Sequence, residues 1–365
     1  SSAASDVYKR QQYEVVYTNR MSAGAYRGYG ATQGIFAVES TVNKLADRLS
    51  MDPIVLRQKN MIHEGDVMPA YYGETANSCR LEECLLKASD MIGWKEKGMR
   101  TVMPDGKIRA RGVAMAMQGS SISNCDVGSV TVKLSDEGTY HITFGCTDMG
   151  TGCDTIIAQF AADVLETPID NISVYGVDTD ISPYDSGSYA SSTTYLTGMA
   201  AVKACEQLRE RIIALAAVRM NKDASALTFD GENVIDESDG AKMSLFDIAT
   251  ASMCNNEISL EVTYSHSSPV SPPPFMAACA EIEADPETGA IELLDYTACV
   301  DCGTVVNTNL ARVQTEGGLL QGIGMTLYED IWYDERGKNL SNSFMQYKVP
   351  SPVSYTHLTL PTIRL

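Results

Sequence analysis

The sequence predicts an α+β protein of two domains, on the basis of its length, its mixture of periodic patterns and one charged segment. The 365 residues are enough for two domains of ordinary size. Runs with helical periodicity and runs with strand alternation are both present, but they do not alternate strictly, and no internal repeat is visible. A charged, turn-rich segment at 94–111 is the best candidate boundary. We therefore expect one domain over 12–100 and another over 105–352.

The first domain is predicted to be mainly helical. After a glycine-rich stretch at 24–33, apolar residues recur at three- and four-residue steps and predict an amphipathic helix: Ile35, Val38, Val42, Leu45 and Leu49. Asp52 followed by Pro53 predicts the start of a second helix, because aspartate caps helices and proline suits the first turn. A third helical stretch covers roughly 81–94.

The second domain is predicted to mix strands and helices. The alternating run SVTVKLSDEGTYHITFG predicts a β-hairpin that turns at 136–138. A glycine-broken loop then leads into a helix with apolar residues on one face, which are Ile157, Phe160, Ala161 and Val164. The remaining elements are expected as a strand at 171–177, a loop at 178–194, a helix at about 195–220, strands at about 258–264, 276–284 and 290–300, and a helix at 310–330.

Composition excludes several classes of function. The net charge of −19 disfavours binding to nucleic acid and to anionic membrane surfaces. No apolar run is long enough to predict a membrane span, and no signal peptide is visible. The ten scattered cysteines are interpreted as free thiols in a reducing cytoplasm. Cys299 and Cys302 form a CxxC motif; we interpret them as small residues at a strand end, and a zinc or redox protein is the alternative.

Both ends of the chain look foreign to this pattern. Residues 1–11 and 353–365 resemble translated adapter or vector sequence, so the fold is predicted without them. Genuine terminal segments are the alternative interpretation.

Three loops share one design, with glycines and hydroxyl residues directly before a helix. They are GAYRGYGATQ at 24–33, DMGTGCDT at 148–155 and SGSYASSTT at 186–194. Helix N-termini present unpaired N–H groups that suit phosphates, so together the loops suggest a large phosphorylated ligand. Ordinary helix capping is the alternative for each loop taken alone. Gln314, one turn before a Gly-Gly pair, is a further ligand-binding candidate or an exposed helix glutamine.

Four motifs in this order resemble the molybdopterin-binding subunit of the xanthine dehydrogenase and aldehyde oxidase family, of bacterial type. They are GAYRGYGATQ, TDMGTGCDTIIAQ, DSGSYASSTTYLTG and VDCGTVVNTNLARVQTEGGLLQGIG. The resemblance covers about 12–352. It implies the two-domain molybdenum-cofactor-binding architecture of the molybdenum hydroxylases, with 12–100 as the C-terminal part of the first cofactor domain and 105–352 as a truncated second one.

The resemblance also implies roles for individual residues. Tyr29 matches an aromatic residue that stacks on the substrate. The matched cofactor-binding residues are Arg27, Met149, Gly150, Thr151, Ala190, Ser191, Thr193 and Gln314. A glutamine is common in the family where Thr151 stands, which puts its contact in question. No residue of this chain matches a metal ligand or the catalytic glutamate, which the resemblance places past the YKVP sequence at 347–350.

The implied reaction is hydroxylation of an electron-poor C–H carbon of a purine-like heterocycle with water. The implied cofactor is molybdenum on molybdopterin, expected as the cytosine dinucleotide form, with electrons passing to 2Fe-2S clusters and FAD on partner subunits. A cytoplasmic dimer of heterotrimers is the expected assembly. An aldehyde or nicotinate-type oxidoreductase and a non-catalytic cofactor-binding scaffold are the alternatives. We expect the chain to be a fragment that does not turn over substrate alone.

Overall fold

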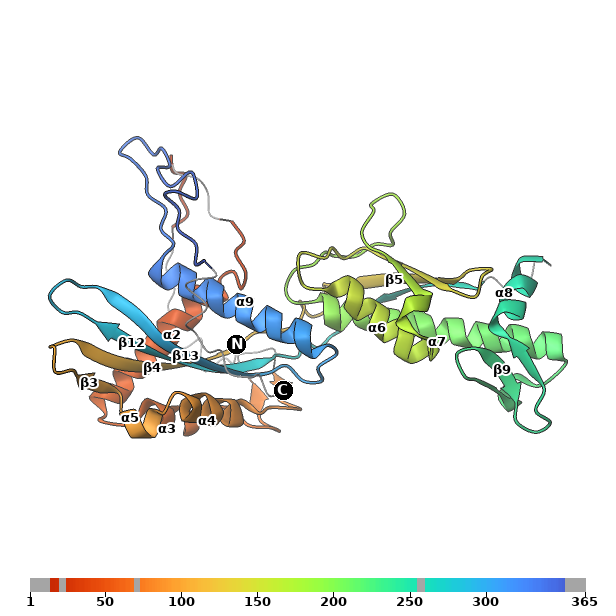
Figure 1. The fold of residues 1–365 in the computed structure, drawn as a ribbon, viewed down its shortest axis with the longest axis horizontal. Helices are drawn as coiled ribbons and strands as arrows, with labels where there is room; N and C mark the ends of the chain where they lie inside the picture. The colour runs from red at the N-terminus through yellow and green to blue at the C-terminus, as the bar shows by residue number, and fades with distance from the viewer. Residues whose placement is uncertain (1–13, 20–23, 69–72, 255–259, 352–365) are drawn as a thin grey trace. The chain divides into compact units, whose positions relative to one another are not determined.

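The computed structural model describes residues 14–19, 24–68, 73–254 and 260–351 (Figure 1). The ends that were expected to be foreign, 1–11 and 353–365, lie outside these ranges. The chain forms two compact units: unit 1 combines 1–118 with 273–365, and unit 2 comprises 119–272. The mixed helix-and-sheet class predicted from the sequence is confirmed. Each helix in the described part of the chain is too short or too polar to span a bilayer.

Unit 1 is built around a four-stranded antiparallel sheet in the order β13-β12-β4-β3. The strands are β3 Arg100–Val102, β4 Ile108–Met117, β12 Phe275–Ala284 and β13 Ile291–Asp301. Helix α4, Leu81–Met91, packs on one face of the sheet and helix α9, Thr308–Leu327, on the other (Figure 1). Because both faces are covered, β12 is rich in small apolar residues on both sides rather than alternating with polar ones.

The segment 94–111, the expected domain boundary, forms α5 Trp94–Lys97, β3 and the first four residues of β4. Its charges are paired across the sheet rather than solvated in a loop. Arg111 forms an ion pair with Glu281, its register partner on β12, and both side chains are buried. Arg109 contacts Glu283 in the same way, at 2.9 Å. The two compact units divide after residue 118, where no charged or turn-rich segment as pronounced is present.

Replacing Glu281 by alanine tests this interpretation of the charged segment. The change leaves the Arg111 guanidinium buried without its carboxylate, so unfolding free energy should fall by about 3–5 kcal/mol. Chemical denaturation measures the loss. The control is Glu83→Ala, which removes an exposed partner of Lys87 and should cost less than ~1 kcal/mol. Equal losses in both variants would contradict a buried ion pair at the β4–β12 junction.

The remaining elements of unit 1 are helices α2 Ala31–Arg48 and α3 Pro53–Gln58 and a small hairpin of β1 Val67–Met68 with β2 Glu74–Thr75. Asp52 caps α3 as predicted, accepting from the Ile54 N–H at 2.7 Å. The predicted helix at 35–49 is also found, but much of its apolar stripe faces outward. The inward face instead carries Ala46 and two polar residues, Glu39 and Asn43.

Unit 2 contains a four-stranded sheet in the order β11-β5-β6-β7. Its strands are β5 Gly128–Leu134, β6 Tyr140–Phe144, β7 Ile172–Tyr175 and β11 Glu261–His266. The predicted hairpin is confirmed as the β5–β6 pair. Strand β7 runs parallel to β6 after a crossover through α6, Cys153–Leu165. Helix α6 and the long helix α7, Thr193–Met220, bury one face of the sheet in the main core of the unit.

A second, smaller sheet in unit 2 was not predicted. It has the order β10-β9-β8, with β8 Leu227–Phe229, β9 Asn233–Asp236 and β10 Lys242–Ser244, and α8 Leu245–Cys254 follows it. Short 3-10 turns at Ile169–Asn171 and Ala224–Ala226 precede β7 and β8. Strands of three or four residues are too short to show a clear alternation, which explains why the sequence pattern missed them.

Candidate functional sites in the two units

The first candidate site lies in unit 1, at the turn that starts α2. Gly28 and Gly30 both have positive φ, 75° and 78°, which glycine adopts at little cost. The N–H groups of Ala31 and Thr32 donate to the Gly28 carbonyl, at 3.0 and 3.2 Å. This tight turn holds Tyr29 at the surface, where the side chain is 52% exposed. The glycines of the motif are thus explained by the backbone that presents this aromatic ring.

Arg27 and Gln314, nominated separately from the sequence, are brought together. The Arg27 guanidinium donates through Nη2 to the Gln314 backbone carbonyl at 3.0 Å and to its side-chain Oε1 at 3.2 Å, across 287 positions of sequence. A carbon added at Gly318 would lie 3.5 Å from Arg27 Cζ, so the guanidinium lies directly against the glycine. We call Arg27, Gln314, Gly317 and Gly318 the arginine cluster.

A carboxylate that the sequence did not nominate lies close to this turn. Burial raises the pKa of Tyr26, and the nearby Glu329 carboxylate raises it further. The Tyr347 hydroxyl donates to Glu329, and this hydrogen bond raises the pKa of Tyr347 to about 12. Both phenols therefore stay protonated at neutral pH. No sequence signal marked Glu329, because it follows the end of α9 by two residues and matches none of the motifs.

The second candidate site lies in unit 2 and begins with the loop at 147–152. Asp148 accepts from the Gly150 and Gly152 N–H groups, at 2.8 and 3.1 Å. Partial burial would raise the pKa of Asp148, but these backbone donors outweigh it and the pKa is lowered. The backbone N–H groups that the sequence suggested for an anionic ligand thus donate to the carboxylate of Asp148 in the same loop. Met149 is 64% exposed beside them.

The loop at 186–192 carries strained backbone at nominated positions. Ala190 and Ser191 have φ values of 51° and 57°, which are uncommon for residues other than glycine. The Ala190 carbonyl accepts from the Ser121 N–H at 2.8 Å. Ser121 itself has φ 87°, and its buried hydroxyl has no hydrogen-bond partner among the described residues. Thr193 is the first residue of α7.

These two loops of unit 2 lie side by side. The Ser188 hydroxyl accepts from the Thr147 N–H and donates to the Thr147 carbonyl, both at 2.8 Å. The structure therefore gathers six nominated residues in one part of unit 2, which we call the loop pair: Met149, Gly150, Thr151, Ala190, Ser191 and Thr193.

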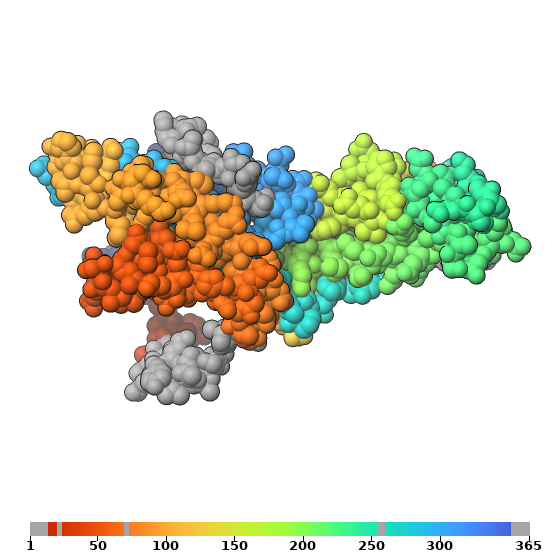
Figure 2. Space-filling view, turned by 90° about the horizontal axis from the view of Figure 1, so that it is seen from below, coloured from red at the N-terminus to blue at the C-terminus, as the bar shows by residue number. Residues whose placement is uncertain are grey.

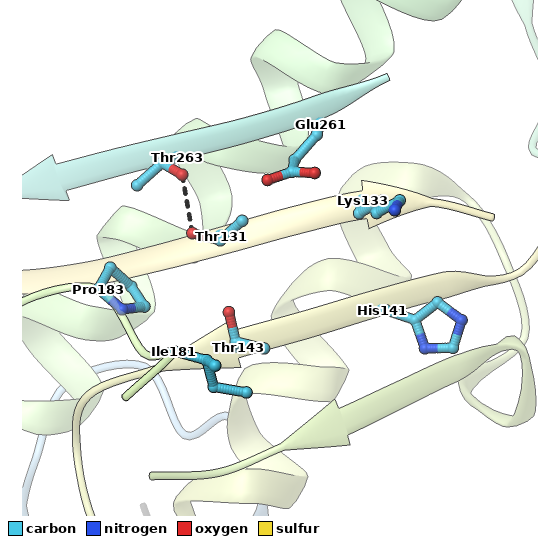
Figure 3. Close-up of a pocket in the computed structure, with 8 residues that line it drawn as sticks. All are labelled: Thr131, Lys133, His141, Thr143, Ile181, Pro183, Glu261 and Thr263. Carbon is cyan, nitrogen blue, oxygen red and sulfur yellow. Dashed lines mark hydrogen bonds between the residues drawn. The ribbon is translucent and has the colours of Figure 1, made fainter. Parts of the chain in front are cut away.

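A shallow cavity of about 410 Å³ lies elsewhere on unit 2, over the sheet face that the helices leave open (Figure 3). Glu261, Lys133 and His141 are register partners across β11, β5 and β6 and stand in one row. The next row includes Thr131 and Thr263, whose hydroxyls are 2.8 Å apart. No nominated residue lines this cavity. It is the polar face that the hairpin alternation predicts for a half-buried antiparallel sheet.

Asp148, Cys153 and Asp154 are the one group of potential metal ligands found among the described residues. Their internal hydrogen bonds account for the arrangement: Asp148 accepts loop amides, and the Cys153 thiol donates to Asp154 at 3.6 Å. We assign no metal to them. Cys299 is buried and Cys302 exposed, and neither belongs to such a group in the described part of the chain, which does not favour a zinc site there.

Comparison with known proteins agrees with the motifs. The sequence matches the molybdopterin cofactor-binding domain family over residues 87–354, and a second molybdopterin cofactor-binding domain family over 8–61. It is 35% identical over 350 residues to the probable hypoxanthine oxidase XdhD of Escherichia coli, covering 93% of this chain and 36% of that protein. It is 31% identical to the putative xanthine dehydrogenase molybdenum-binding subunit XdhA of the same species, covering 92% and 46%.

Solved structures show the same fold. The reconstituted CO dehydrogenase from Oligotropha carboxidovorans superposes with a TM-score of 0.80 at 27% identity, over 93% of this chain and 45% of that one. Quinoline 2-oxidoreductase from Pseudomonas putida has a TM-score of 0.78 over 93% and 45%, and at 24% identity it supports the fold alone. The chain thus has the fold of molybdenum hydroxylase large subunits. It belongs to the molybdopterin cofactor-binding domain family.

Asp148→Asn tests the role of the carboxylate in the loop pair. The variant should lose about 1 kcal/mol of unfolding free energy at pH 7, a figure kept low by solvent screening. Because the folded pKa of Asp148 is lowered, its contribution is present above the unfolded pKa of about 4 and is lost as pH falls through the folded value. The difference from wild type should therefore shrink in acid.

Chemical denaturation at several pH values measures this difference. Asp163→Asn, on the exposed side of α6, is the matched control and should change little at any pH. A deficit in Asp148→Asn that persists unchanged below pH 3 would contradict the assignment.

Proposed function

We propose that this chain supplies cofactor-binding residues to a molybdenum hydroxylase that oxidises a purine-like heterocycle. The observation that carries the proposal is the arginine cluster: two nominated residues from distant motifs meet in one contact. The names of two relatives, a probable hypoxanthine oxidase and a putative xanthine dehydrogenase subunit, support the purine-like substrate class. Because the chain spans less than half the length of these relatives, the activity is proposed for the whole protein.

The residues present fit a molybdopterin. In unit 1, the Arg27 guanidinium and the Gln314 amide supply the cation and the polar donors that a pterin with phosphate groups requires. In unit 2, the hydroxyls of Ser191 and Thr193 are available at the start of α7, and the unpartnered hydroxyl of Ser121 is buried against the same loop. The cofactor, when bound, would supply the oxidising and oxygen-transferring chemistry.

We assign each group of nominated residues its own kind of contact. Arg27 and Gln314 would contact the pterin. The loop pair would hold the cofactor through backbone and hydroxyl groups, with Ala190 and Ser191 set in their strained conformation for close approach. Thr151 would contribute less than its neighbours, because the adjacent amides already donate to Asp148. Tyr29 would offer its exposed ring as a stacking surface for a flat substrate.

Other features of the whole enzyme are inferred from the same family membership. We propose the cytosine dinucleotide form of the cofactor, partner subunits that carry 2Fe-2S clusters and FAD, a cytoplasmic location and a dimer of heterotrimers. We keep the division into cofactor domains at 12–100 and 105–352 as a proposal about the family's units, distinct from the two compact units of the fold. We also propose that these 365 residues do not turn over substrate alone.

A second candidate, an oxidoreductase acting on an N-heterocycle of the nicotine type, is favoured by one further relative. The nicotine 6-hydroxylase large subunit of Paenarthrobacter nicotinovorans is 27% identical over 379 residues, covering 96% of this chain and 46% of that protein. Aldehyde oxidation and a non-catalytic cofactor-binding scaffold are weaker alternatives, which the substrate test below separates.

Cofactor content tests the binding proposal. The protein, in the longest form that its gene encodes, is purified from a host that makes molybdopterin, and molybdenum and oxidised pterin are measured per chain. Arg27→Ala should weaken retention at least about tenfold, because a charge-assisted contact is lost. Arg48→Ala, at the end of α2 and outside the arginine cluster, is the control. Full retention in Arg27→Ala would contradict the role given to the cluster.

Substrate specificity is tested with the same longest form and its partner subunits. Hypoxanthine should be hydroxylated with oxygen from labelled water, ahead of nicotinate and of a simple aldehyde. Tyr29→Leu should raise KM for the heterocycle while cofactor content stays unchanged, because the stacking ring is lost. Bound cofactor without turnover of any of the three substrates would favour the scaffold instead.

A further inference from the structure

Helix α4 is fixed against strand β13 by two hydrogen bonds in unit 1. The Thr297 hydroxyl donates to the Ala88 carbonyl at 2.7 Å, and the Arg80 N–H donates to Asp301 Oδ2 at 2.8 Å. The contacts are four residues apart on the strand and eight apart along the helical segment. Helix and strand run in opposite directions, because the later strand residue contacts the earlier residue of the helical segment. Two strand residues span about 6.8 Å and four helix residues about 6 Å, so positions two apart on the strand lie beside positions four apart on the helix.

The position halfway between these two hydrogen bonds is occupied by a pair of cysteines. Cys299 lies two residues after Thr297 on β13, and Cys84 lies four residues before Ala88 on α4. The packing of α4 on β13 pairs the two thiols, and each is the largest influence on the pKa of the other. Their exposed fractions are only 3% for Cys84 and 5% for Cys299, and both belong to the core between α4 and the sheet.

This pairing differs from the one that the CxxC motif suggests. Cys302 lies beyond the end of β13 and is exposed, whereas Cys299 points into the core toward α4. The partner of Cys299 is therefore 215 positions away in sequence rather than three. No spacing pattern in the sequence could have identified this pair, because only the packing of α4 on β13 creates it.

The environment gives the two thiols different chemistry. The hydrogen bond from Cys84 lowers the pKa of Cys299 to about 7, against the opposing effect of burial; Lys87 lowers it further and Glu83 raises it. The same hydrogen bond, with burial, raises the pKa of Cys84, and the Asp301 and Glu83 carboxylates add to this. Cys299 is thus the more acidic of the two thiols and ionises near neutral pH, whereas Cys84 keeps its proton.

We propose that Cys84 and Cys299 form a peroxide-reactive thiol pair that closes to a disulfide between α4 and β13. The Cys299 thiolate attacks one oxygen of hydrogen peroxide; an S–O bond forms, the O–O bond breaks and hydroxide leaves, taking up a proton as water. Cys84 then gives up its proton and attacks the sulfenic sulfur; the S–S bond forms and the second oxygen leaves as water. Two thiols are oxidised by two electrons, and one peroxide is reduced to two water molecules.

Burial determines which oxidant can act. The outward side of α4 lies on the surface of unit 1 (Figure 2), but the thiols lie on its inner side, within the core. Hydrogen peroxide is small and uncharged, whereas glutathione disulfide is large and anionic. The pair should therefore react with the peroxide and resist the larger disulfide. This inference does not depend on the proposed cofactor or substrate.

Peptide mapping tests the proposal. The full chain is reduced, exposed to hydrogen peroxide, blocked with N-ethylmaleimide and digested. Mass spectrometry should find a dithiothreitol-sensitive link between the Cys84 and Cys299 peptides. The link should form about tenfold faster at pH 8 than at pH 6, since the thiolate fraction of a group with pKa near 7 rises by that factor. Glutathione disulfide in place of peroxide should give little of it.

Serine variants distinguish a Cys84–Cys299 disulfide from one within the CxxC motif, between Cys299 and Cys302. Cys302→Ser should form the link at the wild-type rate, and Cys84→Ser and Cys299→Ser should not form it. A Cys299–Cys302 link in the wild-type chain would overturn the proposal, as would oxidation of Cys299 to sulfinic acid with Cys84 still alkylated. Because the link is identified in the wild-type chain, the result stands even where a serine variant fails to fold.

Discussion

The pairing of β4 with β12 is the constraint on which unit 1 depends. These strands come from opposite sides of the residues that form unit 2, so their ladder joins two distant stretches of chain into one sheet. The buried Arg111–Glu281 ion pair lies within this ladder and fixes its register, because a slip by one residue would bury an unpaired charge. Helix α9 then packs on the sheet that the ladder creates.

The arginine cluster depends on this pairing of β4 with β12. Arg27 precedes α2, in the first stretch of the unit, and Gln314 lies on α9, in the second. They meet because both stretches are held by the same sheet. The glycines at 317 and 318 leave room for the guanidinium on the helix surface. In unit 2, the loop pair depends on a comparable local contact, the two hydrogen bonds between Ser188 and Thr147.

Much of the fold could be predicted from periodicity. The β5–β6 hairpin, the cap at Asp52 and the long helices have strong local signals, and all are found. Strand β4 was missed because its arginines resemble a solvated charged segment until their partners on β12 are known. The apolar periodicity of α2 predicted the helix correctly but not which side of it packs inward, because Glu39 and Asn43 make the contacts to β4. Local pattern cannot reveal a partner 170 residues away.

The nominated site residues came from motifs, and the structure adds which of them meet. It groups Arg27 with Gln314 and groups the loops of unit 2. It also shows Asp148 accepting the amides that had been assigned to a ligand. Glu329 and the Cys84–Cys299 pair had no sequence signal, because each gains its environment from tertiary packing alone.

Hydrogen–deuterium exchange with and without molybdopterin is the most informative measurement, because it reports cofactor binding without requiring turnover. Cofactor binding through the nominated residues should slow exchange at 24–33, 147–152, 186–194 and around Gln314, and leave the open sheet face around Lys133 unchanged. Protection confined to that sheet face, or unchanged exchange at both the arginine cluster and the loop pair, would contradict it.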